Sequence, residues 1–167
     1  YAAVLSGQIT GLGAAVITLS GTSASASDLA AIDAGTTGVI NASSVTTLTG
    51  TVSDLTNIFN TGVKAISGLG KQGILVDDKS LSVVELSSLR SRTTGVINAS
   101  SVTTLTGSVS ELKSIYTPGP LAIAGLGSTN IIVSATSASA SAADLVAIDV
   151  GTTGVVNASS VTALTGI

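Results

Sequence analysis

The sequence contains no cysteine, histidine, methionine or tryptophan. Without cysteine the chain cannot form disulfide bonds, thiolate nucleophiles or cysteine-ligated metal sites. Its many serines lack a histidine or cysteine neighbour that could activate a nucleophile, and no G-x-S-x-G elbow is present. We therefore predict that the protein is not an enzyme, and that it has no catalytic, cofactor-binding or metal-ligating residues.

Charged side chains are also scarce. They make up 9% of the 167 residues, and only six are Lys or Arg, against about 25% charged residues in typical soluble domains. So few basic groups argue against binding to a nucleic-acid backbone. No window reaches the roughly 18 uninterrupted apolar residues that a membrane-spanning helix needs. With 44% apolar residues and a net charge of −3, the chain is expected to be ordered.

The most informative feature is an internal repeat. The stretch TTGVINASSVTTLTG begins at Thr36 and recurs unchanged at Thr93. A third copy with two substitutions, TTGVVNASSVTALTG, begins at Thr152, so the three starts are almost evenly spaced. Such a period is the signature of a repeat architecture. We predict a single segment of nearly three units, about residues 1–50, 51–107 and 108–167, cut from a longer repetitive chain.

Each unit contains a pattern that predicts short capped helices. A hydroxyl residue is followed three positions later by an acid, then by Leu, and then by an aliphatic residue. In this S/T-x-x-D/E pattern the hydroxyl accepts a hydrogen bond from a free N–H at the helix start, and the acid lies favourably at the positive helix end. The predicted cap pairs are Ser25 and Asp28, Thr51 and Asp54, Ser82 and Glu85, Ser108 and Glu111, and Ser141 and Asp144. We expect about two helical turns at each pair, with one buried stripe.

The segments between these helices read as strands. Residues 38–48, 73–78 and 130–136 are rich in β-branched residues and are flanked by Gly, Asn, Ser and Thr. Isolated short helices and strands are marginal, whereas stacked copies can bury a shared core. We therefore predict a repeat solenoid, an elongated stack of coils that each carry β-strands and a short capped helix. The alternative to this α/β solenoid is an all-β parallel β-helix with three coils of about 19 residues per unit.

The repeat also predicts which positions are equivalent in the stack. The valines at Val39, Val96 and Val155 are expected to lie in one buried column together with the aliphatic residues that follow them. Six glycines are expected at corners, where a positive φ is often needed: Gly38, Gly95 and Gly154, together with Gly50, Gly107 and Gly166.

Three asparagines, Asn41, Asn98 and Asn157, occupy one position of the repeat. We interpret them as a structural ladder or turn cap, in which each side-chain amide bonds equivalent groups in neighbouring layers. The alternative is glycosylation, because each begins an Asn-Ala-Ser acceptor. The one adjacent acid pair, Asp77 and Asp78, is interpreted as a solvated turn, with calcium binding as the alternative.

The phrases DLAAIDAGTTGVINASSVTTLTGTVSDL and ADLVAIDVGTTGVVNASSVTALTG resemble tandem repeats of the type DLxxIDxxTTGxVxASxVTTLTG. Such repeats occur in very large secreted or surface proteins of cyanobacteria and other marine bacteria. The resemblance is clear over residues 28–50 and 144–166, and weaker over residues 85–91, where ELSSLRS departs from the pattern. It implies an exported structural or adhesive protein, located outside the cell or on its surface, and it brings no catalytic residues.

The functional hypothesis is mechanical. We expect a structural module of an extracellular fibre, surface layer or adhesin stalk that self-assembles into filaments without a cofactor. Its expected partners are copies of itself, joined head to tail or laterally, and cell-surface polysaccharide is a further candidate. Two alternatives remain: a repeat surface that binds ice or carbohydrate, and a spacer within a larger secreted enzyme.

Overall fold

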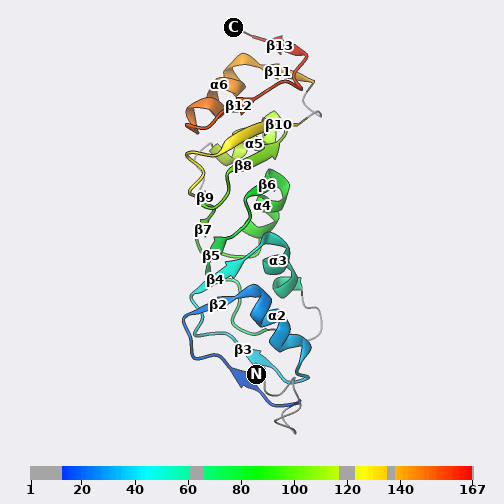
Figure 1. Cartoon of the computed structure of the whole chain (residues 1–167), viewed down its shortest axis with the longest axis vertical. Coiled ribbons are helices and arrows are strands. Elements are labelled where there is room, and N and C mark those ends of the chain that lie inside the picture. The colour runs from blue at the N-terminus through cyan, green and yellow to red at the C-terminus, as the bar shows by residue number, and fades with distance from the viewer. Residues whose placement is uncertain (1–12, 61–65, 117–122, 135–137, 167) are drawn as a thin grey trace.

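The computed structural model describes residues 13–60, 66–116, 123–134 and 138–166, and this part contains five short helices among short strands (Figure 1). The helices are α2 (Ala26–Ala34), α3 (Val52–Asn60), α4 (Val83–Arg90), α5 (Val109–Tyr116) and α6 (Ala142–Val150). The strands are β1 (Ile17–Thr18), β2 (Ser23–Ser25), β3 (Ile40–Asn41), β4 (Thr47–Gly50), β5 (Gly73–Val76), β6 (Ser80–Ser82), β7 (Ile97–Asn98), β8 (Thr104–Gly107), β9 (Ile123–Ala124), β10 (Asn130–Val133), β11 (Ser139–Ser141), β12 (Val156–Asn157) and β13 (Ala163–Thr165). Every strand pair is parallel. The fold is therefore α/β with several parallel sheets, and its helices exclude the all-β alternative.

The elements form successive layers of strands and helix. We number them 1 (residues 17–34), 2 (40–60), 3 (66–90), 4 (97–116), 5 (123–150) and 6 (156–165). Each strand pairs with strands of the adjacent layers, as in Ile74 with Ile97 and Thr47 with Gly73. In Figure 1 the layers follow one another along the long axis, with α2 to α6 in one column.

The layers alternate between two lengths. The helices start at Ala26, Val52, Val83, Val109 and Ala142, so shorter and longer steps alternate, as they do between the predicted cap pairs. Layers 3 and 5 are longer because each inserts one more strand segment before its helix. In layer 5 these segments are β9, β10 and β11, whereas layer 4 has only β7 and β8. In layer 3 the extra segment is a single bridge residue, Ser67, which pairs with Asn41 before β5 and β6 follow. One short and one long layer together make one unit of the sequence repeat.

The inserted segment shifts the sheets sideways. The five-stranded sheet runs in the order β2-β4-β5-β7-β9, with one strand from each of layers 1 to 5, and the next sheet runs β6-β8-β10-β12. Strand β5 pairs with β4, the second strand of layer 2, on one side and with β7, the first strand of layer 4, on the other. Each sheet therefore crosses the stack diagonally, and a new sheet begins one unit later.

This sideways step reconciles two packing distances. Neighbouring strands lie about 4.8 Å apart, whereas packed helices need about 8–10 Å between their axes. Two strand spacings cover only about 10 Å of the roughly 18 Å that two packed helices require. A lateral displacement by one strand position in every unit lengthens the step between units, so both elements can pack in one straight stack.

A continuous core lies between the sheets and the helix column. The helices α3 and α4 each contribute a buried stripe, such as Val52, Leu55 and Ile58 of α3, whereas α6 contributes only Ile148. The strands contribute residues such as Leu48 and Leu105, both fully buried. The residues Ile40 and Ile97 are buried as expected, but the valines before them are not: Val39, Val96 and Val155 are 52%, 59% and 72% exposed. Successive strand residues point to opposite faces, so the valine and the isoleucine cannot both face the core.

Candidate functional site

A motif that is identical in all three copies, Thr-Thr-Gly, lies at the contact between successive layers. We call residues 36–38, 93–95 and 152–154 the Thr-Thr-Gly clamps. Each follows the C-terminal end of a helix in a long layer and leads into the first strand of the next short layer. Because closely similar contacts occur three times, the clamps are the part of the molecule in which sequence repetition and structure can be compared most directly.

The first threonine of each clamp donates a hydrogen bond from its hydroxyl to a backbone carbonyl of the preceding long layer. The buried Thr93 hydroxyl donates to the Gln72 carbonyl oxygen at 2.6 Å and accepts a hydrogen bond from the Gly95 N–H at 2.9 Å. In the third clamp, Thr152 donates to Thr129 O at 2.7 Å and accepts from Gly154 N at 3.0 Å. The hydroxyl thus joins two backbone groups of adjacent layers in a buried place.

The second threonine makes a longer connection on the surface. Its backbone N–H and its hydroxyl both donate to a single carbonyl oxygen, which belongs to the Gly-Leu-Gly turn of the previous long layer. For Thr94 the acceptor is Gly70 O, at 2.9 Å from the N–H and 3.3 Å from the hydroxyl. For Thr153 it is Gly127 O, at 2.8 and 3.1 Å.

The glycine of the clamp is required for space. A Cβ atom at Gly95 would lie 2.2 Å from Gln72 O, and one at Gly154 would lie 2.3 Å from Thr129 O. At Gly38 the distance would be 2.0 Å to Ala15 O. None of these three glycines has a positive φ, so the expectation of left-handed corners is wrong for them and for Gly107, whereas Gly50 and Gly166 do have a positive φ. The backbones of two layers approach too closely for any side chain.

The three repeated asparagines cap turns within their own layer. The Oδ1 atoms of Asn41, Asn98 and Asn157 each accept a hydrogen bond, at 3.0 Å, from the backbone N–H two residues later. The three residues lie in three different sheets, in β3, β7 and β12. Across the layers Asn98 is paired with Leu75 and Ala124 rather than with another asparagine. The amides therefore do not stack on one another as a ladder.

These asparagine turns explain why the predicted strand over residues 38–48 is divided. It consists of β3 and β4, and the turn that begins at Asn41 separates them. The predicted strands at residues 73–78 and 130–136 contain β5 and β10.

Hydroxyl and acid residues lie at the starts of all five described helices. The backbone N–H of Asp28, Asp54, Glu85, Glu111 or Asp144 donates to the hydroxyl three residues earlier, on Ser25, Thr51, Ser82, Ser108 or Ser141. The reciprocal bond from the backbone N–H to the acid occurs at Ser82 and at Ser108, both at 2.8 Å. The hydrogen bonds from the Ser82 backbone and hydroxyl hold the pKa of Glu85 below its ordinary value.

Two polar residues connect neighbouring layers in ways that the sequence did not indicate. Asp78 Oδ2 accepts a hydrogen bond at 2.8 Å from the N–H of Val52, the first residue of α3. This carboxylate therefore caps a helix of the layer below, where a solvated turn or calcium ligand was expected. The buried Gln72 side chain donates to Val45 O at 3.0 Å and to Gly68 O at 2.7 Å. The Asp78–Val52 and Gln72–Val45 contacts join residues that are far apart in the sequence, and the Gln72–Gly68 contact closes a turn. No sequence motif therefore predicts them.

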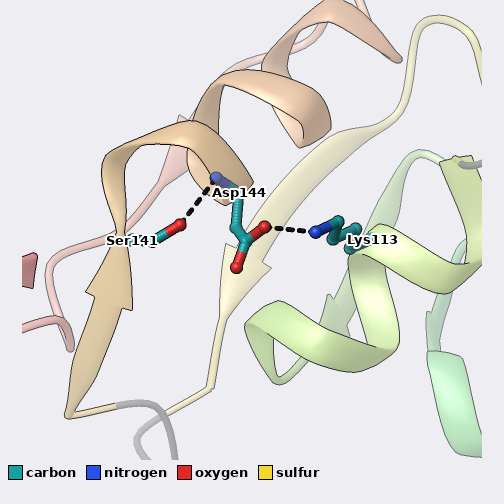
Figure 2. A network of polar contacts seen from close by, with 3 residues as sticks. All are labelled: Lys113, Ser141 and Asp144. Carbon is teal, nitrogen blue, oxygen red and sulfur yellow. Dashed lines mark hydrogen bonds and ion pairs between the residues drawn. The ribbon is translucent and has the colours of Figure 1, made fainter. Parts of the chain in front are cut away.

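An exposed ion pair joins the last two described helices (Figure 2). Lys113 on α5 contacts the carboxylate of Asp144 on α6, while the Asp144 N–H is bound to the Ser141 hydroxyl at 3.0 Å. The hydrogen bond from Lys113 is the main reason that the pKa of Asp144 is lowered. In the preceding unit the position of Lys113 is occupied by Thr56, so this pair is not part of the repeated interface.

Within the described ranges, no three His, Cys, Asp or Glu side chains gather as a metal site would require. A shallow groove of about 640 Å³ between α3 and α4 is lined by hydroxyl, amide and acid side chains, among them Asp54, Asn57 and Glu85, and by two valines, Val52 and Val84. In the same part of the chain, none of the helices has the length and apolar character needed to cross a membrane.

The Thr-rich stretches do not form a continuous array. Thr47 in β4 lies between Ser23 and Gly73, whereas its equivalent Thr104 in β8 lies between Ser80 and Asn130. The two threonines belong to different sheets, because the sheets are displaced by one strand position in each unit. A regular lattice of threonines, which ice binding would need, is thus interrupted after every strand.

Comparison of this chain with protein-family models, with curated protein sequences and with solved structures finds no match.

Proposed function

We propose that this chain is a structural repeat segment whose layers form an α/β solenoid, and that its task is to extend and stiffen a larger assembly. The observation that carries the proposal is the threefold Thr-Thr-Gly clamp, whose first threonine donates to a backbone carbonyl of the preceding long layer in every unit. Among the described residues, every buried side-chain nitrogen or oxygen has a hydrogen-bond partner. Repeat stacks of this kind gain stability from each interface between neighbouring layers. Adding units therefore lengthens the stack without weakening it, which suits a structural role.

The proposed setting is an extracellular fibre, surface layer or adhesin stalk, with copies of the chain assembling into filaments. Two features support it. The resemblance to tandem repeats of large secreted and surface proteins points to this setting, and the polar surface is mainly hydroxyl and amide instead of ionic. A head-to-tail arrangement of identical subunits generates an open filament whenever the rotation between them does not close.

The test is to image the purified chain over a range of concentrations by negative-stain electron microscopy and to measure its small-angle X-ray scattering. We expect rods at low concentration and filaments of uniform width at high concentration. A scattering curve of a compact sphere, with no filaments at any concentration, would refute the proposal. The clamp variant Thr93→Val serves as a control. If the filaments depend on the folded layers, this variant should form fewer of them than the unmodified chain.

A further inference from the structure

The groove between α3 and α4 combines an apolar wall with an acidic one. It has a volume of about 640 Å³. The apolar wall includes Val84, which is 60% exposed, and the polar wall carries the carboxylates of Asp54 and Glu85 among hydroxyl and amide side chains. Among the described residues, no lysine or arginine side chain lines this groove. Its lining therefore carries net negative charge.

The next unit of the repeat shows what occupies the equivalent place there. Helices α5 and α6 correspond to α3 and α4, so Lys113 stands at the position of Thr56 and Asp144 at the position of Glu85. The ammonium group of Lys113 contacts the Asp144 carboxylate and connects the two helices (Figure 2). Between α3 and α4 the short Thr56 side chain cannot make this connection. Within the described part of the chain, no basic side chain forms a salt bridge with Glu85.

The two carboxylates are held in place and can still accept hydrogen bonds. Glu85 Oε2 accepts from the Ser82 N–H at 2.8 Å and from the Ser82 hydroxyl at 2.7 Å. Asp54 Oδ2 accepts from the Thr51 hydroxyl at 2.8 Å. An ionised carboxylate has about four acceptor sites on its two oxygen atoms. These bonds therefore orient both acids without using all of their acceptor capacity.

The chemistry of the groove matches a lysine side chain. An ammonium group offers three N–H donors and no acceptor, which suits a wall of carboxylate, amide and hydroxyl oxygens. The methylene stem of a lysine packs along apolar surface while its charged end stays in contact with water, which suits Val84. The guanidinium of Arg92 contacts Asn60 at the C-terminal end of α3, about 9 Å along the helix from Asp54.

We infer that the groove between α3 and α4 binds a lysine side chain of a partner protein, with its ammonium group directed to Glu85 and Asp54 and its stem along Val84. The bound side chain takes the place that Lys113 fills from within the chain in the next unit. This inference goes beyond the proposed structural function and does not rest on it, because the stack of layers can form whether or not the groove is occupied.

A titration followed by nuclear magnetic resonance tests the site on the whole chain. The probe is lysine with its α-amino and carboxyl groups blocked, added to the ¹⁵N-labelled protein. We expect saturable shifts of the backbone amide signals of α3 and α4, with a dissociation constant in the millimolar range that rises with salt, because exposed ion pairs are weak and screened. Blocked norleucine, which keeps the stem and lacks the ammonium group, is the matched control and should bind about three- to fivefold more weakly.

Four variants locate the bound ammonium group. Glu85→Gln keeps a side chain that can cap α4 and should weaken binding about three- to fivefold. Asp33→Asn, which removes a carboxylate outside the groove, should leave binding unchanged. Thr56→Lys fills the groove from within and should prevent binding. Lys113→Thr opens the equivalent place between α5 and α6 and should add shifts of the amide signals there. Circular dichroism checks that each variant folds.

The possible results separate the inference from its alternatives. Shifts on α3 and α4 that Thr56→Lys abolishes support it. Equal shifts with blocked lysine and blocked norleucine overturn it, and so do shifts that persist in Thr56→Lys. If Thr56→Lys does not fold, equal binding by Glu85→Gln and Asp33→Asn overturns it instead. Shifts with spermidine or calcium ions, but none with blocked lysine, would mean that the groove takes a free cation, which also overturns it. None of these results alters the imaging test of the proposed function.

Discussion

Replacing Thr93 by valine tests whether the clamps hold the layers together. Valine has almost the shape of threonine, so the substitution removes the hydroxyl with little change in packing. Two hydrogen bonds are lost: the one donated to Gln72 O at 2.6 Å and the one accepted from Gly95 N at 2.9 Å. Thr93 is only 5% exposed, so water cannot readily replace either partner.

The expected loss of stability follows from these two bonds. A buried backbone group left without its partner costs about 1–3 kcal/mol, so Thr93→Val should lower the free energy of unfolding by roughly 2–4 kcal/mol. With an m-value of about 2 kcal/mol/M in urea, the unfolding midpoint should fall by about 1–2 M. Urea titration followed by far-ultraviolet circular dichroism measures this shift.

The neighbouring threonine provides a matched control. Thr94→Val removes an exposed hydroxyl whose acceptor, Gly70 O, keeps its hydrogen bond from the Thr94 backbone N–H at 2.9 Å. Its effect should stay within about 0.5 kcal/mol, as for an ordinary surface substitution. Thr93→Ser retains the hydroxyl and should recover most of the stability. Equal midpoints for Thr93→Val and Thr94→Val would refute the assignment of the clamp.

Gly95→Ala should destabilise the fold by at least about 2 kcal/mol, because its Cβ would meet the Gln72 carbonyl; Gly127→Ala, which has open space, should be close to neutral in the same urea titration. Leu105→Ala should cost about 2–5 kcal/mol, and a cost below that of the exposed Leu164→Ala would contradict the assigned core. The lowered pKa of Glu85 stabilises the fold above the unfolded pKa of about 4.3, and this stabilisation disappears as the pH falls through the folded pKa. Glu85→Gln should therefore make unfolding midpoints less dependent on pH in the acid range, and an unchanged dependence would contradict the helix cap. Burial raises the pKa of Tyr116, so stability should fall as the pH rises above about 10, and Tyr116→Phe should reduce that fall in alkaline thermal melts.

The helices of this fold could be predicted from sequence because their signals are local. A hydroxyl, an acid three residues later and an aliphatic stripe lie within one or two turns, as at Ser82, Glu85 and Leu86. The strand segments of an α/β repeat were likewise predictable from β-branched runs between these helices. Both depend on neighbours in the chain.

The sideways displacement of the sheets was not predictable in the same way. We attribute it to the difference between the spacing of neighbouring strands and the spacing of packed helices. This difference leaves no pattern in the sequence of any one segment. The error at Val96 has a local cause, because the alternation of side chains along a strand already places Val96 and Ile97 on opposite faces. Gly95 was explained by φ, whereas the approaching Gln72 carbonyl of the preceding layer is what requires it. The role of Asp78 at the start of α3 depends on a contact with the preceding layer, outside any local pattern.

The diagonal course of the sheets has a consequence for the shape of a long array. Neighbouring strands in a sheet are rotated by roughly 20–25°, and in a continuous sheet this rotation accumulates with every added strand. Here the sheet β2-β4-β5-β7-β9 ends after five strands, while a second sheet has already begun at β6. Coiling is thus limited to the span of one sheet and starts afresh in the next, so an array of many units can stay straight instead of winding into a tight superhelix.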